Sequence, residues 1–253
     1  MDDLAYNQFL TLEKTHWWFI GRRRIFFHLL RKQLPKANNL KILDLGCGFG
    51  GMLDGLSDFG QPMGMEIDME SAQFCKKRGY REICLGSGYT LPIKKNSLDL
   101  ITLFDAIEHI EDDEKVIEQC AGVLKPNGHI MITVPAYQFL YADNDRLAMH
   151  LRRYTLSRLK KLVTNAGFDV IKGSYFNVIL FPLILPAVLM LKLKQKIRGP
   201  LKPDQTGTTN LSYQYPKPIK VLLERILSWE RHLLSFISAP LGHSILLIAK
   251  KKS

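Results

Sequence analysis

The sequence has few cysteines and no apolar run long enough to cross a bilayer. Its four cysteines form no CxxC pair, and the opening MDDLAYNQFLTLEK is acidic and polar, unlike a secretory signal. We therefore expect reduced thiols in a cytosolic protein. The apolar run FNVILFPLILPAVLML contains Pro182 and Pro186 and has sixteen residues, whereas a spanning helix needs about 20. No internal repeat or low-complexity tract is evident.

Negative charge is scarce in the last two fifths of the chain. Residues 151–253 carry 18 Lys and Arg but only 4 Asp and Glu, a net charge of +14, whereas residues 1–150 have a net charge of −3. This asymmetry predicts an anionic partner for the carboxy-terminal part alone, either nucleic acid or a membrane surface. The basic residues there flank apolar runs and lack the interleaved aromatics that stack on single-stranded bases, which disfavours nucleic acid.

The remaining composition and pattern are those of a globular α/β protein. The chain has 253 residues, of which 46% are hydrophobic and 23% charged, enough for one large domain or a catalytic domain with a sizeable insertion. Apolar strand patterns alternate with helical patterns, which predicts a doubly wound, mostly parallel sheet of seven strands. We expect strands at 40–45, 61–68, 81–88, 97–104, 129–135, 168–176 and 243–251. We expect helices at 7–33, 52–60, 69–79 and 111–128, a loop at 136–154, and a further helix from Thr155.

Three parts follow from this pattern. Residues 1–37 form an amino-terminal helical segment, and residues 38–175 with 243–253 form the α/β core. Residues 176–242 form a basic and apolar insertion before the last strand, in place of the short hairpin expected there. Within it, IKVLLERILSWERHLLSFI has the pattern of an amphipathic helix, with Trp229 available for an interface.

A glycine-rich loop follows the first predicted strand. DLGCGFGG places Asp44 before Gly46, Gly48, Gly50 and Gly51, between a strand and a helix. Glycines there allow a tight turn and a close approach of the backbone to a ligand. Taken alone, the loop also fits the GxGxxG pattern of dinucleotide binding, or a purely structural turn.

An acid at the end of the second strand points to a ribose. Glu66 lies 22 residues after Asp44, where a carboxylate accepts hydrogen bonds from both hydroxyls of a ribose and repels a ribose phosphate. The alternative is a solvated charge at a strand end.

Four motifs together resemble one enzyme family. ILDLGCGFGGMLDGL, GMEID, LPIKKNSLDLITLFDAIEHI and LKPNGHIMITVP have the order and spacing of the motifs of class I S-adenosylmethionine-dependent methyltransferases, over about residues 40–135. The acid two residues before the first glycine and the LKPNG turn separate that family from nicotinamide dehydrogenases. The HWW and GRRR start, HLRRYT and PLGHSILLIAKK are similar to a bacterial subgroup of these enzymes.

The resemblance implies a Rossmann-like fold, S-adenosyl-L-methionine as cofactor, and roles for several residues. Glu66 would bind the ribose and Ile67 would pack on the adenine, while Ser87 stands where many relatives have an Asp that contacts the adenine amine. The loop residues Asp44, Gly46, Cys47, Gly48 and Gly50 would hold the amino acid part of the cofactor. Phe104 and Asp105 would line the cleft between cofactor and acceptor.

Two stretches offer catalytic groups. His109 and His150 are candidate bases, with Asp105 beside the first and Asp145 as an orienter of the second. DAIEHIED resembles the corresponding stretch of ubiquinone-type O-methyltransferases, in which such residues can bind a divalent metal. We expect no metal here, with Asp105, Glu108 and His109 as the alternative set of ligands. The same letters also fit helix-start acids and a packing histidine, with no metal. In HLRRYT, Arg153 and Tyr154 are candidate acceptor-binding residues, or parts of a helix start.

HWWFIGRRRIFF has three interpretations: a nucleic-acid clamp, a membrane anchor or a lid over a small-molecule site. The negative net charge of residues 1–150 favours the lid, with Trp17 beside the cofactor. Arg22 to Arg24 would then meet acceptor phosphate, lipid headgroups or acids of the domain itself.

The preferred hypothesis is a cytosolic methyltransferase that acts on an oxygen of a small or lipid-linked acceptor, peripherally at the inner membrane face. The alternatives are a non-catalytic cofactor-binding protein that assists assembly at a membrane, and an NAD-dependent oxidoreductase. The insertion has two kinds of expected role. It binds a membrane or an apolar acceptor, or it serves structure by covering the sheet or forming a dimer contact.

Overall fold

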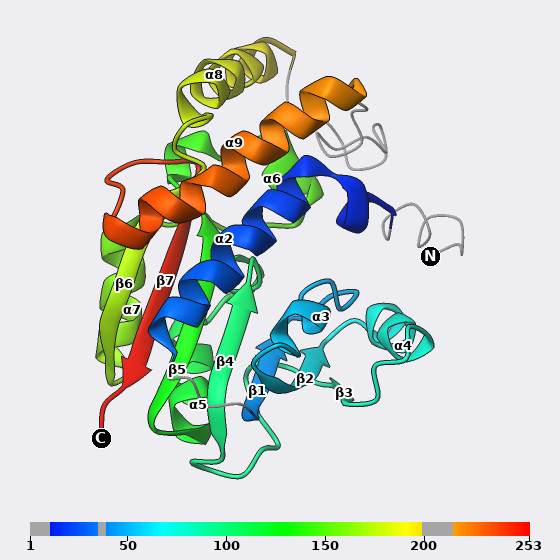
Figure 1. Ribbon diagram of the computed structural model, residues 1–253. Helices are drawn as coiled ribbons and strands as arrows, with labels where there is room; N and C mark the ends of the chain where they lie inside the picture. Colours follow the sequence, from blue (N-terminus) through cyan, green and yellow to red (C-terminus); the bar gives the residue numbers. More distant parts are fainter. Residues whose placement is uncertain (1–10, 35–38, 199–214) are drawn as a thin grey trace.

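The structure is a computed structural model that describes residues 11–34, 39–198 and 215–253. Figure 1 shows a central sheet with helices on both faces. The described residues form a seven-stranded sheet in the order β3-β2-β1-β4-β5-β7-β6. The strands are β1 Leu40–Leu45, β2 Gly60–Glu66, β3 Ile83–Leu85, β4 Leu98–Phe104, β5 Leu124–Pro135, β6 Phe168–Phe176 and β7 Ser244–Lys251.

The first five strands are parallel, and β7 runs antiparallel between β5 and β6. The strand order reverses at β1, which pairs with both β2 and β4. In such a sheet, ligands bind outside the carboxyl ends of the strands at this switch point. The predicted doubly wound, seven-stranded, mostly parallel fold is therefore confirmed. A ligand site is expected at the carboxyl ends of β1, β2 and β4.

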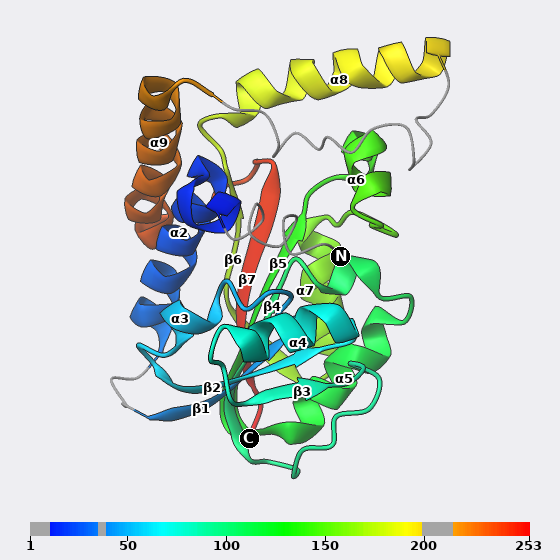
Figure 2. The same cartoon turned by 90° about the vertical axis from the view of Figure 1, so that its right-hand side faces the viewer.

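Helices cover both faces because successive side chains of a strand point to opposite sides. Ile42 packs among buried residues of one face, and the next residue, Leu43, packs on the other. Figure 2 shows the resulting layers, with the sheet between two sets of helices. One face carries α2 Trp17–Gln33, α3 Leu53–Leu56, α4 Met69–Lys77 and α9 Lys217–Phe236. The other carries α5 Asp113–Val123 and α7 Leu156–Asn165.

Several element boundaries differ from those predicted. The expected helix 7–33 is interrupted at His16, whose side chain caps α2 by accepting a hydrogen bond from the Trp18 N–H, and its first residues, 7–10, lie outside the described part. The helix predicted to start at Glu111 and to be ended by Pro126-Asn127-Gly128 already ends at Val123, where the chain enters β5 at Leu124. The helix predicted at 52–60 is the single short turn α3. The loop 136–154 contains a 3₁₀ turn, η2 Gln138–Leu140, and a short helix, α6 Asp143–Leu147.

The insertion before the last strand is helical. It consists of α8 Phe181–Arg198 and α9, and the residues between them, 199–214, lie outside the described part. Figure 1 shows α9 alongside α2, and a Cβ atom added to Gly21 of α2 would come within 2.7 Å of Leu227 Cδ2 of α9. The insertion thus helps to cover one face of the sheet, as one of the interpretations from sequence expected. None of the described helices is long and apolar enough to cross a membrane.

Candidate functional site

The glycine loop follows β1 at the switch point of the sheet. Gly46 and Gly48 have φ angles of +76° and +53°, a backbone region that favours glycine. A Cβ atom at Gly46 would lie 2.7 Å from Ala106 Cβ, so the loop also passes close to the end of β4. A Cβ atom at Gly48 would meet no heavy atom within 4 Å. The backbone at Gly48 therefore faces open space, where a ligand can approach it.

Glu66 ends β2 directly beside this loop. Its Oε2 accepts a hydrogen bond from the Gly48 N–H at 2.8 Å, and its Oε1 accepts from the N–H groups of Ile67 and Asp68 at 2.8 and 3.0 Å. These three donors hold the carboxylate at the loop as an acceptor. A carboxylate at this place fits the two hydroxyls of a ribose.

Asp44 is buried at the end of β1. Its Oδ1 accepts a hydrogen bond from the Thr102 hydroxyl at 2.7 Å. Burial raises the pKa of Asp44 to about 7, against the effect of this hydrogen bond and with a further contribution from the charge of Glu66. Asp44, an acid that titrates near neutral pH, therefore lies just before the glycine loop.

The residues predicted to meet the adenine lie next to Glu66. Ile67 is an apolar side chain that is 72% exposed, and the Gly86 N–H donates to the Glu66 carbonyl at 2.9 Å, which brings the segment after β3 alongside. Ser87 in that segment accepts a hydrogen bond from the Tyr89 N–H. Cys47 is buried beneath the loop. An open backbone, a ribose-type acid and an exposed apolar side chain fit an adenosyl cofactor.

The end of β4 is covered by α2. Phe104 is buried and stacks on Phe26 with ring centroids 5.5 Å apart. Asp105 has a φ of +52° and accepts a hydrogen bond from the Thr133 hydroxyl at 3.0 Å. It also forms an ion pair with Arg22. Among the three partners considered for the arginine run, Arg22 thus meets an acid of the domain itself.

A contact that could not be predicted from the sequence joins the amino-terminal segment to the glycine loop. Arg78 after α4 donates hydrogen bonds to the Glu13 carboxylate, at 3.2 Å, and to the Phe49 carbonyl. A Cβ atom at Gly51 would lie 1.7 Å from Glu13 Oε1, so this carboxylate sits directly on the loop. Glu13 and Arg78 are far apart in the sequence and belong to no shared motif, so only the folded chain brings them together.

Trp17, predicted to lie beside the cofactor, begins α2. Its ring packs edge-on against Trp18, and Trp18 stacks on Phe176 of β6. The Trp17 Nε1 atom is buried and has no hydrogen-bond partner among the described residues. A buried indole N–H without a partner is costly, which marks this donor as available to a bound molecule.

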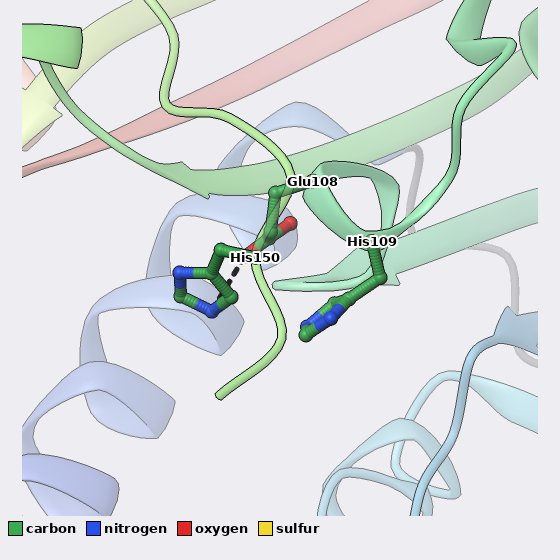
Figure 3. Close-up of side chains that lie close together, drawn as sticks. All are labelled: Glu108, His109 and His150. Carbon is green, nitrogen blue, oxygen red and sulfur yellow. Dashed lines mark ion pairs between the residues drawn. The ribbon is translucent and has the colours of Figure 1, made fainter. Parts of the chain in front are cut away.

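Three side chains meet on the acceptor side of the sheet. Glu108 and His109 belong to the 3₁₀ turn η1 Ile107–His109, and His150 comes from the segment after α6 (Figure 3). The Leu151 N–H donates to the Glu108 carbonyl at 2.9 Å, which joins the two segments. Ligand atoms of Glu108, His109 and His150 lie within 4.8 Å of one another, close enough to share a divalent cation. The structure thus groups Glu108 and His109 with His150, whereas Asp105 is paired with Arg22.

Glu108 is fully buried, and neither of its side-chain oxygens has a hydrogen-bond partner among the described residues. Burial, together with the nearby charge of Asp105, raises its pKa well above the ordinary range, so the neutral acid is favoured. His150 Nε2 lies 3.9 Å from Glu108 Oε1. A neutral acid and an imidazole therefore face each other.

His150 is oriented by Asp145, as predicted. Its Nδ1 lies 2.9 Å from Asp145 Oδ1, which leaves Nε2 as the nitrogen on the side of Glu108. Burial would raise the pKa of Asp145, but hydrogen bonds from His150 and Arg153 hold it at about 2. Asp145 is therefore a stable anion behind the imidazole.

The structure corrects the roles expected for Arg153 and Tyr154. Arg153 is buried, with Nε and Nη2 on the two oxygens of Asp145 at 2.7 and 3.0 Å and Nη1 on the Ala136 carbonyl. Tyr154 is fully buried, and its hydroxyl donates to Asp113 at 2.7 Å. These partners use the polar groups of both side chains, so their observed roles are to fix Asp145 and α5 rather than to contact an acceptor.

Comparisons with known proteins agree with this geometry. The family model of a methyltransferase domain matches residues 43–132. A probable S-adenosylmethionine-dependent methyltransferase of Mycolicibacterium smegmatis is 26% identical over 163 residues, covering 63% of this chain and 62% of that protein. A ubiquinone biosynthesis O-methyltransferase of Cupriavidus pinatubonensis is 23% identical over 161 residues, covering 54% of this chain and 64% of that protein. The matches thus span less than two thirds of the length of these relatives.

The fold has solved counterparts as well. A chain of the complex between the Haloferax volcanii Trm112 methyltransferase activator and a methyltransferase superposes with a TM-score of 0.61 at 15% identity, covering 98% of this chain and 96% of that one. At this identity the likeness concerns the fold. Residues 43–132 thus match a methyltransferase domain, and the open glycine loop beside Glu66 fits S-adenosyl-L-methionine, the cofactor named for the relative from Mycolicibacterium smegmatis.

Proposed function

We propose that this protein transfers a methyl group from S-adenosyl-L-methionine to an oxygen atom of a small or lipid-linked acceptor. The observation that carries the proposal is the Glu66 carboxylate hydrogen-bonded to the open glycine loop at Gly48. The bound cofactor supplies a methyl group on a sulfonium. The protein then has to provide proximity, alignment and, for a hydroxyl acceptor, a base.

The residues around the loop are proposed to hold the cofactor. Glu66 would accept hydrogen bonds from the ribose hydroxyls, and Ile67 would lie on the adenine, near Ser87. Trp17 of α2 would donate its unpartnered N–H to the bound molecule. The amino acid part of the cofactor is held by Asp44, Gly46, Cys47, Gly48 and Gly50, with Phe104 and Asp105 at the boundary to the acceptor.

His150 is the proposed base. Its Nε2 takes the proton of the acceptor hydroxyl as the oxygen attacks, while Asp145 keeps the Nδ1 proton in place and stabilises the imidazolium. Glu108, neutral when buried, and His109 border the same space. A positioned general base contributes about 10²- to 10⁴-fold to such rates. If His150 is the base, its removal should therefore lower the rate of methyl transfer strongly.

The place of action is proposed to be the inner face of a membrane, with the acceptor presented there. The support is the net charge of +14 on residues 151–253, in the same part of the chain as the apolar helix α8. Lysines near an anionic surface contribute about 1 kcal/mol each to binding.

The cofactor assignment is tested by calorimetry on Glu66→Gln. Loss of the charge weakens the hydrogen bonds to the ribose, so the affinity for S-adenosyl-L-methionine should fall about 10- to 100-fold. Glu82→Gln is the matched control, because Glu82 is an exposed acid before β3. Tighter binding of NAD than of S-adenosyl-L-methionine by the unaltered protein would overturn the assignment in favour of an oxidoreductase.

Turnover is tested by transfer of labelled methyl groups to lipid, glycan and phenolic extracts. Label in an ether or ester of a hydroxyl acceptor supports O-methylation. Cofactor binding with no transfer to any extract would support the non-catalytic alternative.

A further inference from the structure

The first half of α8 is apolar on every side and largely exposed. A helix on the surface of a globular domain normally turns a polar face to solvent, and one that is apolar all round is normally covered. One stripe of α8 at helical spacing contains Leu183, Pro186, Met190, Leu193 and Ile197. Its large apolar members are exposed by 72% (Leu183), 59% (Met190), 61% (Leu193) and 81% (Ile197). Leu189 and Leu191, on other sides of the helix, are exposed by 46% and 41%.

The helix α8 contacts the core at Phe181 and at Lys192. Phe181 is buried and its ring stacks on Tyr137, with centroids 6.0 Å apart. Further along, Lys192 donates a hydrogen bond to the Phe139 carbonyl of η2. Beyond these contacts, Figure 2 shows α8 extending past the body of the molecule. The described part of the chain therefore leaves most of this apolar surface uncovered.

The charges on this surface have one sign. The second half of α8 carries Lys192, Lys194 and Lys196, and the helix contains no acid. The first half of α9 adds Lys217 and Arg225 beside the exposed side chains of Ile219, Val221 and Leu222. Its acid, Glu224, is paired with Arg24 of α2. The surface thus presents apolar side chains with cations beside them. A matching partner needs an apolar interior that is bordered by anionic groups.

We infer that α8 and the first half of α9 form a docking surface for an anionic lipid bilayer, with α8 lying in the plane of the interface. No described helix can cross a membrane, and Pro186 interrupts the hydrogen bonding of α8. An interfacial helix places its apolar side chains at the boundary of the acyl chains, and its lysines reach the phosphates of the headgroups. The chemistry of a bilayer surface thus matches both parts of this surface.

A second copy of the chain fits this surface less well. Parallel self-pairing would place the lysines of one α8 near those of the other, where like charges repel, and antiparallel pairing would place them against the uncharged first half of its partner. A groove of another protein would need an acidic rim around a long apolar channel. The bilayer meets both requirements without such a specific shape.

The surface lies at the functional end of the molecule. Figure 1 shows α8 and the start of α9 at the same end as the carboxyl ends of β4 and β5. The glycine loop follows β1 at this end of the parallel strands, and His150 lies beside Glu108 of η1, which follows β4. Tyr137, which contacts Phe181 of α8, follows β5 directly. Docking would therefore face the site toward the bilayer. That an acceptor with a lipid tail enters from there rests on the methyl transfer proposed above, whereas the docking itself does not.

The test is sedimentation of the full chain with phosphatidylcholine vesicles, with and without phosphatidylglycerol. We expect binding to the anionic vesicles that weakens with salt. Met190→Asp/Leu193→Asp and Lys194→Glu/Lys196→Glu should each reduce the bound fraction about tenfold or more. Lys94→Glu/Lys95→Glu is the control matched in charge, because these exposed lysines precede β4, at the opposite end of the sheet, and it should keep most of the binding.

The outcomes separate this inference from the proposed function. No binding of the unaltered protein to anionic vesicles at low salt would overturn the docking surface. An equal loss in the Lys94 and Lys95 control would show non-specific attraction and would also overturn it, as would a dimer that Met190→Asp/Leu193→Asp dissociates. Calorimetry with S-adenosyl-L-methionine is run on every variant, and we expect unchanged affinity. A protein that binds vesicles but not the cofactor would remove the methyl transfer and leave the docking surface standing.

Discussion

At the scale of single residues, Asp44 couples the cofactor loop to pH. The carboxyl is fully buried, and burial raises its pKa to about 7. The charged groups that act on it are Glu66, which raises the pKa further, and Arg22, which lowers it. If Asp44 accepts hydrogen bonds from the amino acid part of the cofactor, the ammonium of that part favours the carboxylate. Binding then draws a proton off Asp44.

The affinity for S-adenosyl-L-methionine should therefore rise with pH and level off above about 7. Below that pKa, the free protein holds the proton that binding expels, so the affinity changes by up to about tenfold per pH unit. Calorimetry in buffers of different ionisation enthalpy measures the released proton directly. Asp44→Asn should abolish both the proton release and the slope, and Asp58→Asn, an exposed acid after α3, should keep them. An affinity of the unaltered protein that is flat through pH 7 would contradict this role.

Substitution of His150, together with chelation, distinguishes base catalysis from metal catalysis at Glu108, His109 and His150. With His150 as base, His150→Asn should lower kcat about 10²- to 10⁴-fold and leave cofactor affinity unchanged. His232→Asn, an exposed histidine of α9, is the control. Turnover should survive a chelator. Loss of turnover on chelation, with recovery on adding Mg²⁺, Mn²⁺ or Zn²⁺, would instead assign Glu108, His109 and His150 to a cation.

The proximity of the residues proposed to bind the cofactor could be predicted from the sequence because they are local. Asp44 and the glycines are contiguous, and Glu66 ends the next strand, so the strand pattern alone places them together. The acceptor side is different, since His150 meets Glu108 only through the contact of two loops 42 residues apart in sequence. Arg153 was expected to bind an acceptor because an arginine in a loop looks available, but its contact with Asp145 depends on the fold of that loop.

At the scale of elements, the packing of α2 against α9 requires the two helices to approach each other closely. Gly21 of α2 is buried against Leu227 of α9, and a Cβ atom there would meet three side-chain atoms of Leu227 within 3.0 Å. The amino-terminal helix and the insertion, which the sequence separates by about 200 residues, thus share one packed interface. Their helical character could be predicted from apolar periodicity, but their pairing could not.

Gly21→Ala should therefore destabilise the protein, although alanine favours helices. Overpacking a tight helix contact costs about 1 to 3 kcal/mol, which exceeds the gain of up to about 1 kcal/mol in helix propensity. Gly122→Ala in α5 is the control, because its Cβ atom would meet nothing within 4 Å, and it should be neutral or stabilising. Urea unfolding measures both. A Gly21→Ala variant as stable as the unaltered protein would show that α2 and α9 separate easily.

Trp17 tests whether α2 acts as a lid. Trp17→Phe removes the unpartnered N–H and keeps most of the apolar ring. If that N–H binds the cofactor, affinity for S-adenosyl-L-methionine should fall about 5- to 30-fold, equivalent to one hydrogen bond. Trp229→Phe on the exposed side of α9 is the matched control. Unchanged binding in both variants would leave Trp17 a packing residue.

At the scale of the whole molecule, the composition predicted that a basic carboxy-terminal part differs from the rest of the chain, and the fold shows which elements form that part. The strand and helix pattern was sufficient for the sheet, because both faces are covered and strands such as β1, β4 and β7 are largely apolar. The charge asymmetry predicted a basic part, and the structure places α8 and the start of α9 at the end of the molecule that carries the site (Figure 1). Which side chains of the insertion are exposed could not be predicted, since a helix that is apolar all round gives no periodic signal for its covered face.

Cofactor binding should stabilise the whole fold, because the loop, β2 and α2 all border the site. A ligand at 100 times its Kd adds about 2.7 kcal/mol to the free energy of unfolding, which for a chain of this size corresponds to a Tm increase of about 5 to 10 °C. A thermal melt with S-adenosyl-L-methionine should show this increase, and NAD at the same concentration should not. Glu66→Gln should lose most of the increase at a fixed cofactor concentration, whereas Glu82→Gln should keep it. A larger shift with NAD would contradict the cofactor, and an equal shift in both variants would contradict the placement of the ribose at Glu66.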